Sequence, residues 1–288
     1  GRVRRGLLRD DLFTAVHEQF LTDTARLADI IFPATTFLEH NDLYTSYGHT
    51  YLQFGPKIIE PMGQCRSNHD LICALANKLD ADHLGFRLDE REIIDQTLRN
   101  SRYPDLATLE KNRLFDTGSN FQEAHFLNGF PQADRKFHFH AGWTSTNNTR
   151  TPLPDLPDFS NLMDKATVDR PYRLITGPSR HFLNSTFSET TTSKKLQKRP
   201  TAKINPNDAD KLNMSHGDII RIGNNKGSIA IHAEVTSDTR IGTIVVESVW
   251  PNDAFIENIG INLLTSAEAS QPTGGAPFHD TSIWVRAN

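Results

Sequence analysis

Short apolar runs organise the first 40 residues of the chain. The runs at 12–16 and 30–32 predict two strands, the first of them buried, and Pro33 ends the second because proline cannot donate a ladder hydrogen bond. Between the runs, residues 22–29 predict a short helix with Thr22 or Asp23 as its N-cap. A strand, a short helix and a second strand in close succession are typical of a sheet with helices on its faces.

A longer amphipathic helix is predicted downstream, with Ser67 or Asn68 as its cap. Its apolar face, at helical spacing, consists of Leu71, Ile72, Leu75, Ala76 and Leu79. The segment before this helix is rich in Tyr, Phe and Thr around Gly48, which predicts a hairpin or two extended segments.

The middle of the chain is more polar. Residues 89–100 and 105–115 predict two further helices, and 135–142 predict one isolated strand. Prolines then gather in 151–171, where apolar residues are few, so this stretch is the best candidate for a linker.

Strand patterns dominate after Pro171. Four alternating or apolar runs are separated by Gly, Asn and Asp turns, and one helix is predicted at 205–213. The runs cover residues 218–225, 227–235, 242–249 and 281–287. Short strands at this regular spacing predict a barrel or a sandwich.

Composition narrows the class of protein. The 288 residues have 37% hydrophobic content and a net charge of −4, which suits a folded chain of about two domains and does not suit nucleic-acid binding through bulk positive charge. Only Cys65 and Cys73 are present, too few for a disulfide framework or a four-thiolate metal site. No apolar run reaches the roughly 20 residues that span a membrane. We therefore expect no membrane insertion and no nucleic-acid partner.

One stretch carries more polar side chains than a simple strand-to-loop connection needs. In "PYRLITGPSRHFLNSTF" (171–187), a short apolar run stops at a Gly-Pro pair and a crowd of donors and acceptors follows. On residue types alone, the favoured explanation is that these groups bond to their own backbone. Catalytic candidates are absent: no serine triad, Walker loop or paired carboxylates is apparent, and His138 and His140 lack a third metal ligand.

Two blocks of sequence resemble a known family. The first holds "TDTARLADIIFPATTFLEHND" (22–42) and the helix-bearing stretch 55–80. The second holds "LITGPSRHFLNSTF" (174–187), the run 204–250 with Asn-Pro-x-Asp-Ala and His-Gly-Asp motifs, and 262–287. In order and spacing they resemble the C-terminal part of molybdopterin oxidoreductases of the dimethyl sulfoxide reductase family, and the second block resembles their molybdopterin dinucleotide-binding domain.

The resemblance implies a fold. Residues 1–165 would be an α/β remnant of the catalytic domains plus the linker: the end of a Rossmann-like region, a β-hairpin and helices. Residues 166–288 would be an all-β, six-stranded double-psi barrel that binds the molybdopterin dinucleotide.

The resemblance also implies a cofactor, bis(molybdopterin guanine dinucleotide) with Mo or W. Such a ligand needs phosphate donors, small residues for close approach, and mixed donors and acceptors. The residues expected to contact it are Thr176, Gly177, Ser179, Arg180, His181, Asn184, Ser185, Thr186, Trp250, Asn262, Gly274 and Gly275. For Trp250 a place in the core, and for Asn262 a turn cap, are alternatives; Gly274 and Gly275 also suit an ordinary turn.

Departures from the family pattern bear on function. No cysteine cluster for an iron–sulfur centre and no Ser or Cys ligand to the metal is recognisable, and Asp42 stands where the family usually has Gly. We therefore expect a fragment, a split subunit or a shortened piece of a molybdenum or tungsten oxidoreductase that takes part in oxygen-atom or electron transfer and is inactive alone. An iron–sulfur cluster is expected only in the missing N-terminal part.

Two alternatives remain open from the sequence. The chain is a non-catalytic subunit of an electron-transfer complex that keeps the fold without the metal, or a double-psi barrel unrelated to molybdopterin. The expected partners are the missing N-terminal half or a companion subunit, and a redox partner protein. Cytoplasm is the expected compartment, with the periplasm as the alternative.

Overall fold

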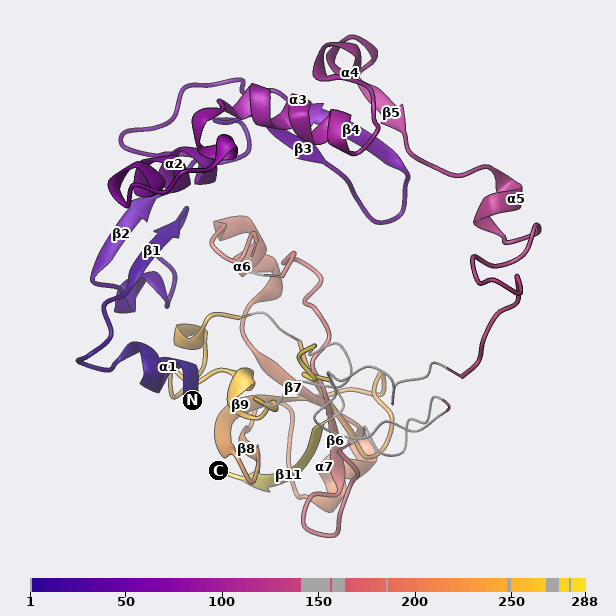
Figure 1. Cartoon of the computed structure of the whole chain (residues 1–288). Helices are drawn as coiled ribbons and strands as arrows, with labels where there is room; N and C mark the ends of the chain where they lie inside the picture. Colours follow the sequence, from indigo (N-terminus) through magenta and orange to yellow (C-terminus); the bar gives the residue numbers. More distant parts are fainter. Residues whose placement is uncertain are drawn as a thin grey trace. The chain divides into compact units, whose positions relative to one another are not determined.

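The chain divides into two compact units, Val3–Phe137 and His138–Asn288. The computed structural model describes residues 2–140, 156, 164–184, 186–247, 250–267, 275–279 and 281–288. The predicted domain boundary at 165/166 remains a prediction. Figure 1 labels most of the helices and strands along the chain.

Up to Phe137 the chain forms short strands and helices. In order they are α1 (Arg2–Leu7), β1 (Ala15–Glu18), η1 (Ala25–Leu27), β2 (Ile30–Pro33), β3 (Asp42–Tyr44), β4 (Tyr51–Gly55), α2 (Asn68–Lys78), η2 (Leu84–Arg87), α3 (Glu90–Asn100), α4 (Leu106–Asn112), β5 (Leu114–Asp116) and α5 (Phe121–Ala124).

The first strands form a small parallel sheet. β1 pairs with β2 in parallel register, with Val16 opposite Ile31, as the strand–helix–strand pattern predicted. The predicted cap is wrong: η1 begins after Thr24, although the Thr22 hydroxyl accepts a 3.3 Å hydrogen bond from the Ala25 N–H. The predicted burial of the first strand is also wrong, since Phe13 is 69% exposed and Ala15 is exposed.

A second sheet carries the core of this unit. β3, β4 and β5 form an antiparallel sheet in that order, and the β3–β4 hairpin turns near Gly48 at φ +95°, as predicted. Both predicted helices form, as α3 and α4, and pack against β4. The buried side chains are Leu52, Phe54, Ile94, Leu98, Leu106 and Leu109.

The predicted helix α2 is confirmed, but its apolar face is not buried. Ser67 caps it as predicted, since its Oγ accepts a 3.1 Å hydrogen bond from the Asp70 N–H. Of the five apolar face residues only Ala76 is buried, and Leu79 is 76% exposed. Spacing predicts which residues share a face, whereas burial depends on what packs against it.

The strand predicted at 135–142 is wrong over its described part, 135–140, which forms no strand. A turn forms instead: the Phe130 N–H donates to the Arg135 carbonyl at 2.9 Å, and Arg135 has φ +59°. The Phe137 ring packs on Phe130, with centroids 5.3 Å apart. Local aromatic packing therefore replaces the extended conformation that the alternation favoured.

The C-terminal unit is built from six strands. Its elements are β6 (Tyr172–Ile175), α6 (Thr191–Gln197), β7 (Thr201–Ile204), α7 (Pro206–Lys211), β8 (Ile219–Asn224), β9 (Gly227–Val235), β10 (Thr243–Val246), η4 (Asn252–Ala254), η5 (Ile261–Leu263) and β11 (Thr281–Ala287). The sequence missed α6 and β7; Thr190 caps α6 through its hydroxyl, which accepts from the Ser193 N–H at 3.4 Å.

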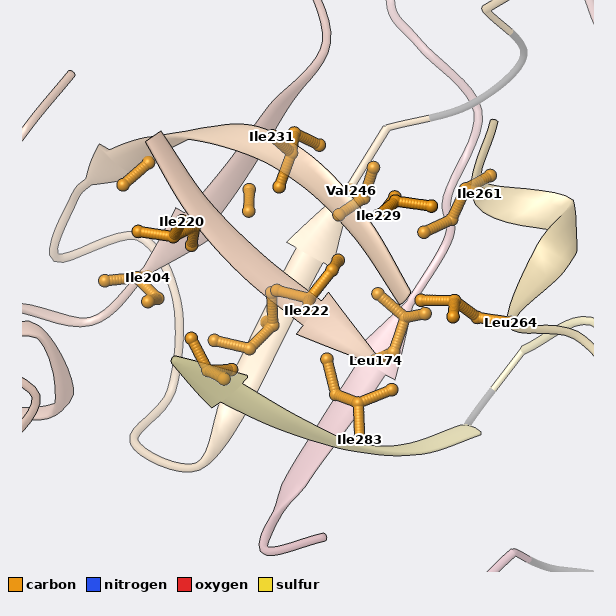
Figure 2. Close-up of a cluster of buried hydrophobic side chains, with 14 of the residues drawn as sticks. Leu174, Ile204, Ile220, Ile222, Ile229, Ile231, Val246, Ile261, Leu264 and Ile283 are labelled. Atoms are coloured by element: carbon orange, nitrogen blue, oxygen red, sulfur yellow. The ribbon is translucent and has the colours of Figure 1, made fainter. Parts of the chain in front are cut away.

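The strands close into a barrel in the order β10-β6-β11-β8-β9-β7. The pairs β6–β10 and β7–β9 are parallel, and the other four are antiparallel. Alternate side chains fill the interior, and Figure 2 shows isoleucines of β8 and β9 in one cluster with Leu174 of β6 and Ile283 of β11. All six strands contribute to this core, so the barrel alternative of the sequence prediction is confirmed and the sandwich is not.

Candidate cofactor-binding site

The polar stretch leaves the barrel at the end of β6 and runs to α6; we call residues 176–190 the β6–α6 loop. Thr176 begins it and is buried. Its Oγ1 donates a 2.7 Å hydrogen bond to the Phe278 carbonyl and lies 3.3 Å from His279 Nδ1. This contact brings the loop beside the segment that begins at Gly275, two regions that the sequence expected to share one ligand.

Gly177 follows in an open position. A Cβ placed on it would meet no heavy atom within 4 Å, and its φ is not positive. The glycine is therefore required neither by backbone conformation nor by close packing within the described protein. An open side next to a buried Thr176 leaves room for a ligand to approach the backbone closely.

A tight turn presents the next polar groups. The Leu183 and Thr186 backbones exchange hydrogen bonds of 2.9 and 3.0 Å, and Asn184 adopts φ +54° at the turn. Asn tolerates this left-handed conformation better than most residues. Asn184 and Thr186 are exposed. Ser185, also predicted to contact the cofactor, lies outside the described residues.

Between Gly177 and this turn, the side chains alternate between anchoring and exposure. Ser179 and Phe182 are buried, Arg180 is exposed and His181 is half-buried. The Phe182 ring meets Trp250 edge to face, with centroids 4.8 Å apart and an interplanar angle of 82°. The loop is thus fixed by its apolar residue while its guanidinium remains available to a ligand.

The remaining residues predicted to contact the cofactor lie outside the β6–α6 loop. Trp250 packs against the barrel core, which fits its alternative interpretation as a core residue. Asn262 is exposed on η5, which the buried Asn224 amide holds through a 2.8 Å hydrogen bond to the Leu264 carbonyl. Gly275 is exposed, and Gly274 lies outside the described residues. Cofactor contact at these positions stays a prediction.

The donors of the β6–α6 loop fit one side of a dinucleotide. A guanidinium suits a phosphate, and an amide with a hydroxyl suits the edges of a guanine or pterin ring. Arg180, Asn184 and Thr186 provide these groups, and Gly177 leaves space beside them. A small cavity of about 110 Å³ lies elsewhere in this unit, beside β9 and η4, where Arg199, His232 and Phe255 line it.

The described part of the chain contains no group of three or more His, Cys, Asp or Glu side chains placed to hold a metal ion. Within the same ranges no helix is long and apolar enough to cross a membrane.

Comparison with known proteins identifies the family. The model of the Molydopterin dinucleotide binding domain matches residues 172–282, which include the β6–α6 loop, the barrel strands β6 to β10 and the start of β11. The model of the Molybdopterin oxidoreductase family matches residues 1–78. The chain matches the C-terminal part of molybdopterin oxidoreductases. The predicted cofactor class, a molybdopterin dinucleotide, is thereby confirmed, without distinction between Mo and W.

Curated relatives extend the match over the whole chain. The probable oxidoreductase YoaE of Bacillus subtilis is 33% identical over 99% of this chain and 41% of its own length. Dimethyl sulfoxide reductase DmsA of Escherichia coli is 25% identical over 97% of this chain and 38% of its own length. The chain thus spans about two fifths of the length of these two relatives and corresponds to their C-terminal part.

The fold has a counterpart of known structure. Acetylene hydratase from Pelobacter acetylenicus superimposes with a TM-score of 0.77 at 17% identity, over 99% of this chain and 41% of that one. At this identity the likeness shows a shared fold and no shared reaction.

Several residues that shape the site carried little or no signal in the sequence. Phe182, Gln197 and Glu247 hold the β6–α6 loop through partners up to 68 positions away in the chain. An aromatic residue within a polar stretch was the one available hint, at Phe182. For Gln197 and Glu247 no sequence pattern indicated a partner.

Proposed function

We propose that this chain is the C-terminal portion of a molybdenum or tungsten oxidoreductase and supplies one wall of the site for bis(molybdopterin guanine dinucleotide). The observation that carries the proposal is the β6–α6 loop, which presents Arg180, Asn184 and Thr186 to solvent from a backbone anchored at Thr176. The same loop lies within the part of the chain that matches the dinucleotide-binding family model.

The bound metal–pterin group would supply the redox chemistry of oxygen-atom or electron transfer. The chain's own residues bind and orient it. Arg180 neutralises a phosphate, and the Asn184 amide and Thr186 hydroxyl fix the direction of a ring edge or a ribose. Thr176 is satisfied within the protein, so its role is to hold the loop against the Gly275–His279 segment.

The barrel is proposed to be of the double-psi type. Its two parallel pairs, β6–β10 and β7–β9, support this topology because each joins strands that are not neighbours in the chain. Parallel pairing of this kind requires crossover connections, which bring loops from both halves of the sequence to the barrel surface.

The complete site needs partners. β1–β2 is a parallel pair with exposed apolar side chains, including Ile30, Ile31 and Phe32, and α2 exposes Ile72 and Leu75. Parallel sheets are normally covered on both faces. We therefore propose that the remaining part of the enzyme, or a companion subunit, covers this layer; a separate redox protein and an iron–sulfur cluster in the absent part remain predictions.

Asn184→Gly in the complete protein tests the proposal. Glycine keeps the left-handed backbone without strain and removes only the amide. We expect the guanine nucleotide released by acid from the purified protein to fall severalfold per polypeptide. The matched control is Asn213→Gly, at an exposed Asn with φ +51°, which should leave the released nucleotide unchanged.

Two results would count against the proposal. Equal nucleotide release from the two variants returns the loop to a purely structural role. Wild-type protein that releases no guanine nucleotide identifies a non-catalytic subunit or an unrelated barrel. The 288-residue chain alone should not reduce an N- or S-oxide with reduced viologen, and turnover by it would contradict the proposed division of the site.

A further inference from the structure

The far end of the β6–α6 loop is held by one carboxylate outside the barrel core. Gln197, the last residue of α6, donates a 2.6 Å hydrogen bond from Nε2 to Glu247 Oε2. Lys203 Nζ donates to the other oxygen, Glu247 Oε1, at 2.5 Å. Glu247 therefore bridges α6 to strand β7 with both of its carboxylate oxygens.

This bridge lies in a partly shielded place. The Lys203 and Glu247 side chains are 29% and 26% exposed, and the hydrogen bond to Glu247 is the main reason that the pKa of Lys203 is raised. β7 pairs with β10 beside it, with Lys203 opposite Val245. Both strands belong to the closed barrel, and Glu247 directly follows β10, so its carboxylate is attached to a rigid part of the fold. The hydrogen bond to Gln197 ties α6 to this carboxylate.

The chain leaving β10 touches the loop a second time. Trp250 lies three residues after Glu247 and packs on Phe182, in the middle of the β6–α6 loop. The loop thus has three anchors: Thr176 at its start, Phe182 in the middle and, beyond its end, Gln197 on α6. Glu247 and Trp250 make two of the three.

We propose that Glu247 is a positioning residue for the cofactor-binding loop. Glu247 joins Lys203 to Gln197 and so holds α6 in place. Because α6 directly follows the β6–α6 loop, it also fixes the C-terminal end of the loop that presents Arg180 and Asn184. The expected effect of Glu247 on retention of the cofactor rests on the proposed function. The mechanical part, that Glu247 orders α6, stands on the contacts of the chain alone.

The mechanical part is tested on the 288-residue chain by limited trypsin digestion. α6 contains Lys194 and Lys195, so cleavage after them reports local opening of this helix. Mass spectrometry monitors cleavage at these two sites. In Glu247→Ala we expect this cleavage to be on the order of tenfold faster, because a charged hydrogen-bond acceptor is lost. Gln197→Met should give the same acceleration with the Lys203–Glu247 pair intact.

Two further variants separate positioning from general stability. Glu247→Gln keeps an acceptor for Gln197 and should restore most of the protection. Glu234→Ala removes a comparable bond on the same barrel, the 2.6 Å contact from Thr201 Oγ1, and should leave cleavage in α6 unchanged. Barrel melting, followed by tryptophan fluorescence, should agree within about 2 °C between the Glu247→Ala and Glu234→Ala variants.

Guanine nucleotide release from the complete protein completes the test. Severalfold lower release in Glu247→Ala, with recovery in Glu247→Gln, supports the proposal. Unchanged cleavage of α6 overturns the positioning role itself. Faster cleavage of α6 in Glu247→Ala with unchanged release of guanine nucleotide overturns the link between Glu247 and the cofactor. If Asn184→Gly also releases the normal amount of nucleotide, the proposed function of the loop is itself wrong.

Discussion

The two units of the chain differ in how their apolar residues are used. In the C-terminal unit every strand of a closed barrel contributes buried side chains to one core. In the N-terminal unit the core is confined to β4, α3 and α4, while the β1–β2 pair and α2 leave large apolar side chains exposed. Closure leaves the barrel without unpaired strand edges, whereas the parallel pair keeps apolar side chains exposed, which is why we propose that further polypeptide covers it.

The largest expected effect is in the barrel core. Ile222→Ala, at a side chain with 0% exposure, should lower the free energy of unfolding by about 2–5 kcal/mol because it leaves a cavity among rigid strands. Trp143, Trp250 and Trp284 all lie in 138–288, so tryptophan fluorescence in urea reports this unit. An unchanged midpoint would show that the barrel is less tightly packed than its burial indicates.

Next in size is the core of the N-terminal unit. Leu98→Ala, at 1% exposure, should destabilise this unit by about 2–4 kcal/mol and leave the tryptophan transition where it is. Hydrogen exchange of α3 and α4 measures the effect. Leu79→Ala, at 76% exposure, is the control and should change stability by less than about 0.5 kcal/mol. A shift of the tryptophan transition in Leu98→Ala would mean that the units unfold together.

The two units should also differ in their stability at acidic pH. Hydrogen bonds from the Thr36 backbone and from Arg99 hold the pKa of Glu39 and Asp95 below their ordinary values, and Thr108 does so for Asp105. A carboxylate whose pKa is lower in the folded than in the unfolded protein stabilises the fold. This stabilisation is fully present at pH values above the unfolded-state pKa, 4.5 for Glu and 3.8 for Asp, and it is lost as the pH falls through the folded-state pKa.

In the described part of the C-terminal unit, Glu257 is the carboxylate with a lowered pKa, through Arg221. Circular dichroism and tryptophan fluorescence, followed from pH 7 to about pH 3, should therefore show loss of helix before loss of the barrel signal. Simultaneous loss of both signals would contradict this order.

The smallest expected effect is at a helix cap. Ser67→Ala removes the acceptor for the Asp70 N–H and should cost about 1 kcal/mol, within the N-terminal unit only. Ser67→Asp is the matched variant, because it restores an acceptor and adds a favourable charge at the helix start. Protection of the α2 amides against hydrogen exchange should fall in the first and recover in the second.

Local features of the fold were predictable from the sequence where local chemistry decides them. The Ser67 cap, the turn at Gly217 with φ +91° and the strands β8 and β9 follow from a capping hydroxyl, a glycine and strict alternation. The burial of α2 was not predictable, because exposure of Leu79 depends on which polypeptide covers it.

The candidate site was predictable in part for the same reason. The polar crowd after β6 was visible in the sequence, but its three anchors were not. Each joins residues far apart in the chain, such as Phe182 with Trp250 and Gln197 with Glu247. A single sequence offers no periodicity that reports such contacts, and a resemblance indicates the ligand without indicating what holds the loop.

Barrel closure also sets the order in which this unit can form. β6 takes its place between β10 and β11, the last two strands in chain order, and the Thr176 to Phe278 bond spans 102 residues. Contacts of such separation slow folding, since a long loop must close before they form. During synthesis β6 therefore has neither of its barrel neighbours until β10 and β11 emerge, and unpaired strand edges of this kind are where partly folded chains tend to associate wrongly.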